Sequence, residues 1–311
     1  MVAEINRRLF LKRTGQFAGL AASAGSLEAL LAACGGNVST PSSSSSSGTS
    51  TQSIASKGLK MPNLLQWGAT SQGGAPYVYA DPTNPTQLVG FEYEIAVAIT
   101  KLMGIQQKQI ETDYAQLDQA LQAGKFDIIL NGWESTPDRE KTQLFTQSYY
   151  HYGQQIVVRS DDSRFSSKTL NDDLGLKDLH GFTVGTGAGF KAADILSTDP
   201  KIKLKTYDPD LPFNDLDLGR IDAVLIDLPT VAYYVSGAGV GAQPDKKLRL
   251  IGKPFALSDY VIGLKKDDPN AVVLQKELDQ AITEMKNNGS LRKILEKWQL
   301  WNDQQAAIGT K

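Results

Sequence analysis

The sequence predicts an α/β protein built from two similar lobes. Apolar runs of strand length alternate along the chain with segments whose apolar residues recur at helical spacing, an order typical of mostly parallel sheets flanked by helices. An internal repeat supports the two lobes: residues 124–132 read Gly, Lys, apolar, Asp and an apolar strand, and residues 219–227 repeat that order with Arg in place of Lys. Because each copy delivers polar groups at the end of a strand, we expect the lobes to face a shared cleft.

The composition limits the classes of function. The 311 residues include 32 basic and 34 acidic side chains and 41% hydrophobic residues, which is enough apolar material for one or two packed domains. The formal net charge of −2 gives no basic footprint, so we expect no nucleic-acid partner. The chain has one cysteine, and His151 and His180 lie in unrelated contexts, so we expect no intrachain disulfide, metal, cofactor or catalytic residue.

Residues 1–34 are predicted to be an export signal. The segment 6–12 resembles a twin-arginine signal, and the Gly/Ala-rich stretch after it is too interrupted to span a membrane. Residues 31–35, Leu-Ala-Ala-Cys-Gly, resemble a bacterial lipobox, in which Cys34 is acylated, for example with palmitate, and becomes the new N-terminus. General secretory export and a bystander cysteine are the alternatives.

The body of the protein is predicted to follow a flexible tether. Residues 35–60 are rich in Ser, Thr and Gly and lack the apolar side chains that would order them. Such a tether would hold the body close to a membrane, outside the cytoplasm. The remaining chain is predicted to form the first part of lobe 1, then lobe 2, the return to lobe 1 and a tail, at 61–158, 159–253, 254–302 and 303–311.

Lobe 1 is predicted to begin with a strand at 64–68. The helix after it carries Ile95 and Ile99 on one apolar face and ends at Gly104. A second, short helix ends at Gly124, where a glycine can take the left-handed conformation of a helix C-terminus.

The apolar run 126–130 is predicted to be the buried central strand of lobe 1. After it, Ser135 or Thr136 can cap a helix that starts at Pro137, where the missing N–H costs nothing. Arg139 then lies in the first turn of that helix. A guanidinium beside unpaired backbone N–H groups suits a carboxylate or a phosphate, although a solvated Arg on an ordinary helix is the alternative.

Lobe 2 is predicted to follow a crossing strand at 154–159. A strand at 182–184 leads into the glycine-rich turn 185–189, which either directs N–H groups toward an anion or is a plain tight turn. The strand 221–226 then delivers Asp227, which either faces the cleft or caps the next helix. With Arg139 in the other lobe, Asp227 would place opposite charges on the two sides of the cleft, as a zwitterion requires.

The last segment is predicted to return to lobe 1. The apolar run 261–264 rejoins the first sheet as a strand. The final helix has Ser290 as its N-cap and buries Leu291, Leu295 and Trp298.

Several ordered segments resemble one family of proteins. They are Val-Gly-Phe-Glu at 89–92, Leu-x-x-Gly-Lys-Phe-Asp at 121–127, Thr-Pro-Asp-Arg at 136–139, Ser-Tyr-Tyr at 148–150, Gly-Arg-Ile-Asp-Ala-Val at 219–224, and Gly-Ser-Leu at 289–291 with Lys-Trp at 297–298. From about residue 64 to residue 298, the chain is similar to the extracytoplasmic solute-binding proteins, family 3, of polar amino-acid ABC transporters, in their lipoprotein form. The resemblance implies a two-lobed periplasmic-binding-protein fold with a ligand cleft between hinged lobes. It also implies a lipid-anchored monomer outside the cytoplasm that binds a free amino acid and delivers it to an ABC permease.

The resemblance also implies the ligand contacts. Arg139 would bind the ligand carboxylate, and Asp227 would bind the ligand ammonium group. The other contacts would be two backbone amides of lobe 2, an aromatic lip residue and a carbonyl of lobe 1, at Ala188, Gly189, Tyr114 and Gly132, with Asn131 as the alternative to Gly132. Glu134 departs from the family pattern, because many members carry Ser or Thr there, and it either contacts the ligand or pairs with Arg139 in the open state.

Two rival functions remain open at this point. A cyclohexadienyl-type dehydratase of the same fold would use Glu134 as a general acid, and a sensory binding module would signal to a membrane partner. Within the leading interpretation, Glu134 adds a negative charge in or near the cleft. This charge favours a basic or a neutral polar amino acid over an acidic one, because a second anion would add repulsion.

Overall fold

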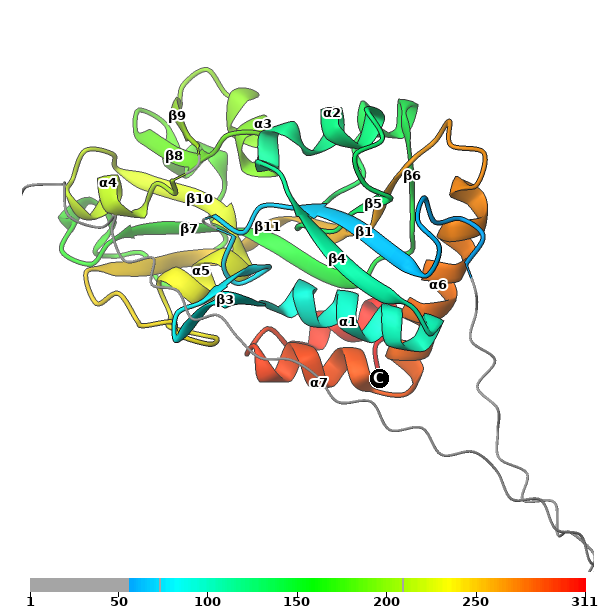
Figure 1. The fold of residues 1–311 in the computed structure, drawn as a ribbon. Helices are drawn as coiled ribbons and strands as arrows, with labels where there is room; N and C mark the ends of the chain where they lie inside the picture. Colours follow the sequence, from blue (N-terminus) through cyan, green and yellow to red (C-terminus); the bar gives the residue numbers. More distant parts are fainter. Residues whose placement is uncertain (1–55, 73, 209) are drawn as a thin grey trace, which may run out of the picture. The chain divides into compact units, whose positions relative to one another are not determined.

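The computed structural model describes residues 56–72, 74–208 and 210–311. The export signal, Cys34 and the predicted tether up to residue 55 lie outside the described residues. The described chain folds into two α/β lobes, each built around a five-stranded sheet (Figure 1). Within these residues, no helix combines the length and the apolar composition that a membrane crossing needs.

The sheet of lobe 1 has four strands that run in one direction and one strand that runs against them. In spatial order the strands are β4 (Gln106–Glu111), β1 (Leu64–Ala69), β5 (Ile128–Ile129), β12 (Gly263–Lys265) and β6 (Gln143–Phe145). β1 pairs in parallel with β4 and β5, whereas β12 pairs antiparallel with β5 and β6. A separate hairpin is made by β2 (Tyr79–Asp81) and β3 (Asn84–Val89).

The sheet of lobe 2 likewise has four strands that run in one direction and one strand that runs against them. In spatial order its strands are β11 (Leu248–Tyr260), β7 (Tyr150–Arg159), β10 (Ala223–Asp227), β8 (Thr183–Gly187) and β9 (Lys203–Tyr207). β8 pairs in parallel with β9 and β10, whereas β7 pairs antiparallel with β10 and β11. The predicted α/β class with mostly parallel strands is therefore confirmed in both lobes.

Helices cover both faces of the lobe 1 sheet (Figure 1). On one face α1 (Phe91–Met103), α6 (Ala271–Asn287) and α7 (Ser290–Lys297) pack together, and α2 (Leu117–Gln122) lies on the other face. Lobe 2 carries α3 (Lys191–Ser197), α4 (Phe213–Asp217) and α5 (Leu228–Tyr234). Short 3-10 helices complete the chain at η1 (Tyr114–Gln116), η2 (Arg139–Lys141), η3 (Ser163–Phe165), η4 (Leu176–Leu179) and η5 (Asp303–Ile308).

The central strands are buried on both faces, which explains their continuous apolar runs. In β5, Ile128 packs into the core that contains α1, and Ile129 packs into the core that contains α2. In β10, Leu225 and Val224 enter the cores on the two sides of the lobe 2 sheet. Strands covered by helices on both faces lose the alternation of apolar and polar residues.

The internal repeat of the sequence has a structural role in each lobe. Asp127, just before β5, accepts a hydrogen bond from the backbone N of Gln66 in β1 at 2.7 Å. Asp222, just before β10, accepts one from the backbone N of Thr183 at the start of β8 at 2.8 Å. Each aspartate of the repeat thus satisfies a backbone donor of the neighbouring parallel strand.

The strands β7 and β11 connect the two lobes. They are paired from Tyr150 with Tyr260 at one end to Arg159 with Leu248 at the other. Tyrosines of these strands pack in the core of lobe 1, and their aliphatic residues pack in the cores of lobe 2. The crossing strand predicted at 154–159 is therefore observed, with its start at Tyr150.

Two predicted helix starts are wrong. The helix expected from Pro137 is only the single turn η2, because β6 begins directly after it, although Thr136 Oγ1 does accept a hydrogen bond from the N of Arg139 at 3.3 Å. Ser290 is not the N-cap of α7 but its first residue. The N-cap is Gly289, which has a φ of 74°.

Both ends of the described chain pack against lobe 1. The segment 303–311, predicted as a tail, contains η5, and its Gln305 is buried. The Gln305 side-chain amide accepts a hydrogen bond from the N of His151 at 2.9 Å and donates one to the carbonyl of His151 at 2.8 Å. At the other end, the N of Lys60 donates to Oδ1 of Asp127 at 2.9 Å.

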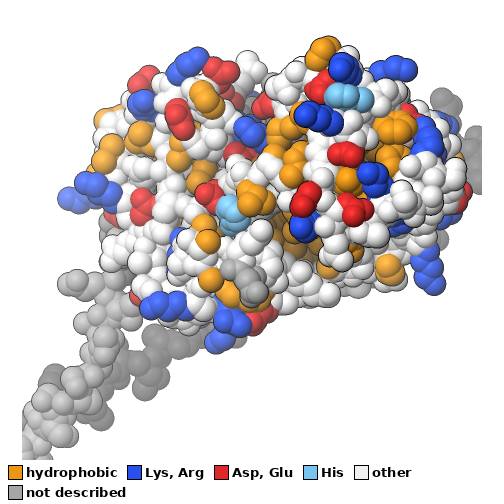
Figure 2. Space-filling model, turned by 180° about the vertical axis from the view of Figure 1, so that it is seen from behind, with side chains coloured by type: hydrophobic (Ala, Val, Ile, Leu, Met, Phe, Trp, Pro, Cys, Tyr) orange, Lys and Arg blue, Asp and Glu red, His pale blue; other side chains and the backbone are white. Residues whose placement is uncertain are grey.

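The surface carries charges of both signs. Figure 2 shows Lys and Arg side chains interspersed with Asp and Glu side chains over one face of the molecule. Hydrophobic side chains lie between them, as is ordinary for a folded protein. This pattern agrees with the formal net charge of −2.

Candidate functional site

A cavity lies between the two lobes. It lies beyond the carboxyl ends of strands from both sheets. Four of its lining residues lie just past the ends of β1, β5, β8 and β9: Thr70, Asn131, Ala188 and Asp208. A fifth lining residue, Asp227, is the last residue of β10. In open α/β sheets, the crevice at these strand ends is the usual place for a ligand. The cavity is therefore the candidate binding site.

The lobes contact each other beside this cavity. Tyr114 of lobe 1 packs edge-on against Phe190 of lobe 2, with 4.9 Å between the ring centroids. The Tyr114 hydroxyl donates to the carbonyl of Gly132 at 3.4 Å. Gly189, next to Phe190, has a φ of 74°, which favours glycine. Tyr114 and Phe190 thus close one side of the cavity.

Asp227 presents a buried carboxylate at the cavity wall. Its Oδ2 accepts hydrogen bonds from the hydroxyls of Tyr260 at 2.6 Å and Tyr77 at 3.3 Å, and its Oδ1 accepts one from Nε2 of Gln154 at 2.7 Å. The side chain makes no cap hydrogen bond to α5. Burial raises the pKa of Asp227 to about 7, and the charge of Glu134 adds to this rise, while the three hydrogen bonds oppose it.

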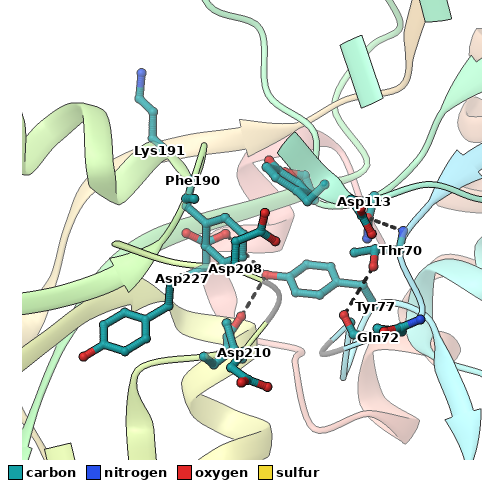
Figure 3. A pocket seen from close by; sticks show the side chains of 17 residues that line it. Thr70, Gln72, Tyr77, Asp113, Phe190, Lys191, Asp208, Asp210 and Asp227 are labelled. Atoms are coloured by element: carbon teal, nitrogen blue, oxygen red, sulfur yellow. Dashed lines mark hydrogen bonds between the residues drawn. The ribbon is translucent and has the colours of Figure 1, made fainter. Parts of the chain in front are cut away.

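Tyr77 reaches this carboxylate from lobe 1 (Figure 3). The backbone of Tyr77 lies against the start of α1, where its carbonyl accepts from the N of Glu92 at 3.1 Å. Gly90 makes this contact possible, because a Cβ at Gly90 would collide with the Tyr77 carbonyl. The Tyr77 hydroxyl also lies 2.8 Å from the hydroxyl of Tyr260. A hydrogen-bonded group of both lobes therefore surrounds Asp227.

Acidic side chains dominate the charge of the cavity lining. Asp113, Asp208, Asp210 and Asp227 line it, and Lys191 is the one cation among the described lining residues. In Figure 3 the side chains of Asp208, Asp210 and Asp227 lie around the cavity, and the Lys191 side chain extends away from them. The lining should therefore attract a cation more strongly than an anion.

Arg139 and Glu134 form a buried ion pair, and neither residue is part of the cavity lining. Nη1 of Arg139 lies 3.1 Å from Oε2 of Glu134 and donates to its backbone carbonyl at 3.0 Å. The guanidinium carbon lies 3.4 Å from the ring centroid of Trp133, and the Tyr152 hydroxyl donates to Oε1 of Glu134 at 2.6 Å. Burial raises the pKa of Glu134 above its ordinary value, and the charge of Arg139 and the hydrogen bond from Tyr152 oppose this rise.

A third buried carboxyl group lies behind Gly132. Oε1 of Glu92 accepts hydrogen bonds from the N of Gly132 at 2.8 Å and from the hydroxyl of Tyr149. Oε2 of Glu92 is buried and has no hydrogen-bond partner. Burial raises the pKa of Glu92 to about 8, although these two hydrogen bonds oppose the rise. Glu92 therefore supports the backbone of Gly132 through a carboxyl group that keeps its proton to a higher pH than an ordinary glutamate.

The structure brings part of the predicted site together. The predicted residues that line the cavity are Tyr114, Gly132, Ala188 and Asp227. The predicted residues that are not among the lining residues are Glu134, Arg139 and Gly189.

Several residues of the lining are not among the predicted site residues. Asp208 and Asp210 follow β9, whose sequence Lys-Leu-Lys-Thr-Tyr has no apolar run that would mark it as a strand. Thr230 lies in α5, directly after Asp227, whereas Tyr77 reaches Asp227 only through the packing of the lobes. A search for acidic residues just after every possible strand would have found Asp208.

Two α/β lobes with a cavity between them are the architecture of a two-lobed binding protein. Residues 68–300 match the family model of the bacterial extracellular solute-binding proteins, family 3. The chain belongs to this family. The predicted family, fold and extracytoplasmic location are therefore confirmed.

Named relatives support this assignment. The chain is 30% identical over 240 residues to the probable amino-acid-binding protein YxeM of Bacillus subtilis, and the match covers 76% of this chain and 84% of YxeM. It is 30% identical over 237 residues to the arginine-binding extracellular protein ArtP of Bacillus subtilis, and the match covers 74% of this chain and 84% of ArtP. The solved structure of an ancestral arginine-binding protein bound to arginine has a TM-score of 0.64 at 29% identity, and the match covers 76% of this chain and 99% of that one.

Proposed function

We propose that this chain binds a free amino acid between its lobes and delivers it to an ABC permease. The observation that carries this proposal is the cavity at the strand ends of both sheets, with the buried carboxylate of Asp227 in its wall. Membership of the solute-binding family and the relatives named for amino-acid and arginine binding support it.

Asp227 is proposed to receive the ligand ammonium group. An ionised carboxylate has about four lone-pair sites, and Tyr260, Tyr77 and Gln154 use three of them. One site therefore remains for an ammonium donor. The other proposed contacts with the ligand are Tyr114, Gly132, Ala188 and Gly189.

The preferred ligand is proposed to have a cationic or a neutral polar side chain. Four aspartates and one lysine line the cavity, so an acidic side chain would meet mostly like charge. The arginine-binding relatives agree with this preference.

A dehydratase is the less supported alternative. A general acid must reach the bond that it protonates, yet Glu134 is outside the cavity lining and is paired with Arg139. The named relatives are binding proteins.

A thermal-shift panel of the free amino acids tests the function and the ligand class together. We expect arginine, lysine, histidine or glutamine to raise the melting temperature, because a ligand that binds only the folded state stabilises it. Stabilisation by glutamate or aspartate alone would reverse the proposed class. Asp227→Asn should abolish the shift, whereas Asp161→Asn, at a side chain that is 89% exposed, should keep it.

We further propose that the protein is a monomer held at the membrane by a lipid on Cys34, through the tether at 35–60. The support is the lipobox pattern of residues 31–35 and the twin-arginine pattern of residues 6–12. Labelled palmitate should enter the natural chain and not Cys34→Ser, and only the natural chain should partition into the detergent phase. Absence of label from the natural chain would refute the anchor.

A further inference from the structure

The guanidinium of Arg139, which the family resemblance assigned to a ligand carboxylate, already holds a carboxylate of the protein itself. Nη1 donates to both the side chain and the backbone carbonyl of Glu134. The pair is well buried, with 16% of the Arg139 side chain and 2% of the Glu134 side chain exposed. A ligand carboxylate that approached this side of the guanidinium would therefore compete with Glu134 for Nη1.

Further contacts hold the pair in place. The Tyr152 hydroxyl donates to the second carboxylate oxygen of Glu134 at 2.6 Å, and the ring of Trp133 lies beneath the guanidinium of Arg139. Displacement would break the bond to Arg139 and leave a buried carboxylate without its cation, which is strongly unfavourable. The internal carboxylate is also always present, since it lies five residues away in the same chain.

The opposite side of the site is arranged for positive charge. Asp208, Asp210 and Asp227 line the cavity directly, and the Lys191 side chain extends away from them (Figure 3). A cationic group of the ligand therefore meets carboxylates at once, whereas a carboxylate of the ligand meets no free guanidinium in the described lining.

We infer that Glu134 determines specificity by acting as an internal carboxylate on Arg139, so that the site selects a ligand by its cationic groups and gains little from its carboxylate. This inference rests on the proposed function, because it concerns the same cavity. The ligand class that it implies is an amino acid with a cationic side chain, together with the amine that lacks the α-carboxylate.

The first test compares arginine with agmatine, which is arginine without its carboxylate, by calorimetry on the natural protein. We expect dissociation constants within about tenfold of each other. A preference for arginine of more than about a hundredfold would overturn the inference, because the carboxylate would then supply much of the affinity. This comparison requires no variant.

The second test removes the internal charge with Glu134→Gln, which keeps the size of the side chain. Arg139 is then free of its anion, so the affinity for arginine relative to agmatine should rise by about tenfold or more. The matched control is Glu140→Gln, which removes an exposed acid next to Arg139 and should leave the ratio unchanged. An unchanged ratio in folded Glu134→Gln would refute the inference.

Failure of the inference can be distinguished from failure of the proposed function. If the natural protein binds no amino acid and no amine, the proposed function and the inference both fail. If it binds arginine tightly but binds agmatine only weakly, the inference alone fails and the proposed function stands.

Discussion

Asp227 couples the binding site to pH. Its carboxyl group is only 6% exposed and accepts hydrogen bonds from Tyr260, Tyr77 and Gln154. Because burial raises its pKa to about 7, the group is partly protonated near neutral pH. Its ionised form attracts an ammonium group, and its neutral form does not.

We therefore predict that the affinity for a cationic amino acid rises as the pH increases from about 6 to about 8. The sign follows from the raised pKa, because Asp227 gains its charge only as the pH passes about 7. Calorimetric titration at several pH values measures this. Asp161→Asn should keep the pH dependence, and an affinity for cationic ligands that falls over this range would contradict the assignment.

Glu92 links pH to the stability of the fold, which is predicted to fall as the pH rises. Its pKa is raised from an ordinary value of 4.5 to about 8, mainly by burial. Between these values the folded protein keeps a proton that the unfolded chain has released. The contribution of this group to stability is therefore complete below pH 4.5 and is lost as the pH rises through about 8.

Glu92→Gln should remove this loss. We predict similar unfolding free energies for the variant and the natural protein near pH 5, and an advantage for the variant that grows by up to about 1.4 kcal/mol per pH unit toward pH 8. Urea denaturation at several pH values measures the difference. The exposed Glu284→Gln is the control, and a constant difference for Glu92→Gln would exclude the linkage.

At the scale of the elements, the repeated aspartates fix the alignment of neighbouring strands. Asp127 accepts hydrogen bonds from the backbone N of Lys60, which lies before β1, and of Gln66, which lies within β1. Asp222 performs the same task for Thr183 in lobe 2. The repeat that suggested two similar lobes is thus a repeat of strand support.

Asp127→Ala is predicted to reduce the unfolding free energy by about 1–3 kcal/mol, because two backbone donors lose their acceptor. Chemical denaturation measures the loss. Asp138→Ala, at a side chain that is 90% exposed, should change the unfolding free energy little. Equal effects of the two substitutions would contradict the role given to Asp127.

Element prediction from the sequence succeeded where apolar residues form a clear pattern. Ile95 and Ile99 defined α1, and the apolar run of β10 placed Asp227 at a strand end. No prediction was made for α6, although Leu274, Leu278 and other residues repeat there at helical spacing. β9 could not be predicted in this way, because four of its five residues are exposed and alternate between polar and apolar types without a buried run.

The arrangement of the candidate site was less predictable than its members. The sequence left two roles open for Glu134, and only the distance to Arg139 in the folded chain distinguishes them. Likewise, Tyr77 lies 150 positions before Asp227, so their hydrogen bond depends on how the lobes pack. Local patterns identify strand ends, but they do not give the distances between them.

At the scale of the whole molecule, the lobes close the cavity through Tyr114 and Phe190. These rings come from different lobes, so their contact forms only when the lobes are together. An aromatic pair of this kind contributes about 0.5–1.5 kcal/mol beyond the area it buries.

Phe190→Ala should therefore weaken the binding of arginine by about threefold to tenfold, mainly through faster dissociation. Stopped-flow or surface-plasmon measurements give the two rate constants. Leu218→Ala, at an exposed apolar residue of lobe 2, should leave both rates unchanged. Unchanged dissociation in Phe190→Ala would separate that ring from the closure of the lobes.

The place of β12 in the sheet sets the order in which the chain can fold during its synthesis. β12 lies between β5 and β6, yet its residues Gly263–Lys265 are made after every strand of lobe 2. Until they are available, the inner edges of β5 and β6 lack their partner and can pair with other chains. The strands of lobe 2 are complete by Tyr260, so this later lobe can form its sheet while the first remains open. The N-terminal lobe is thus the last to be finished.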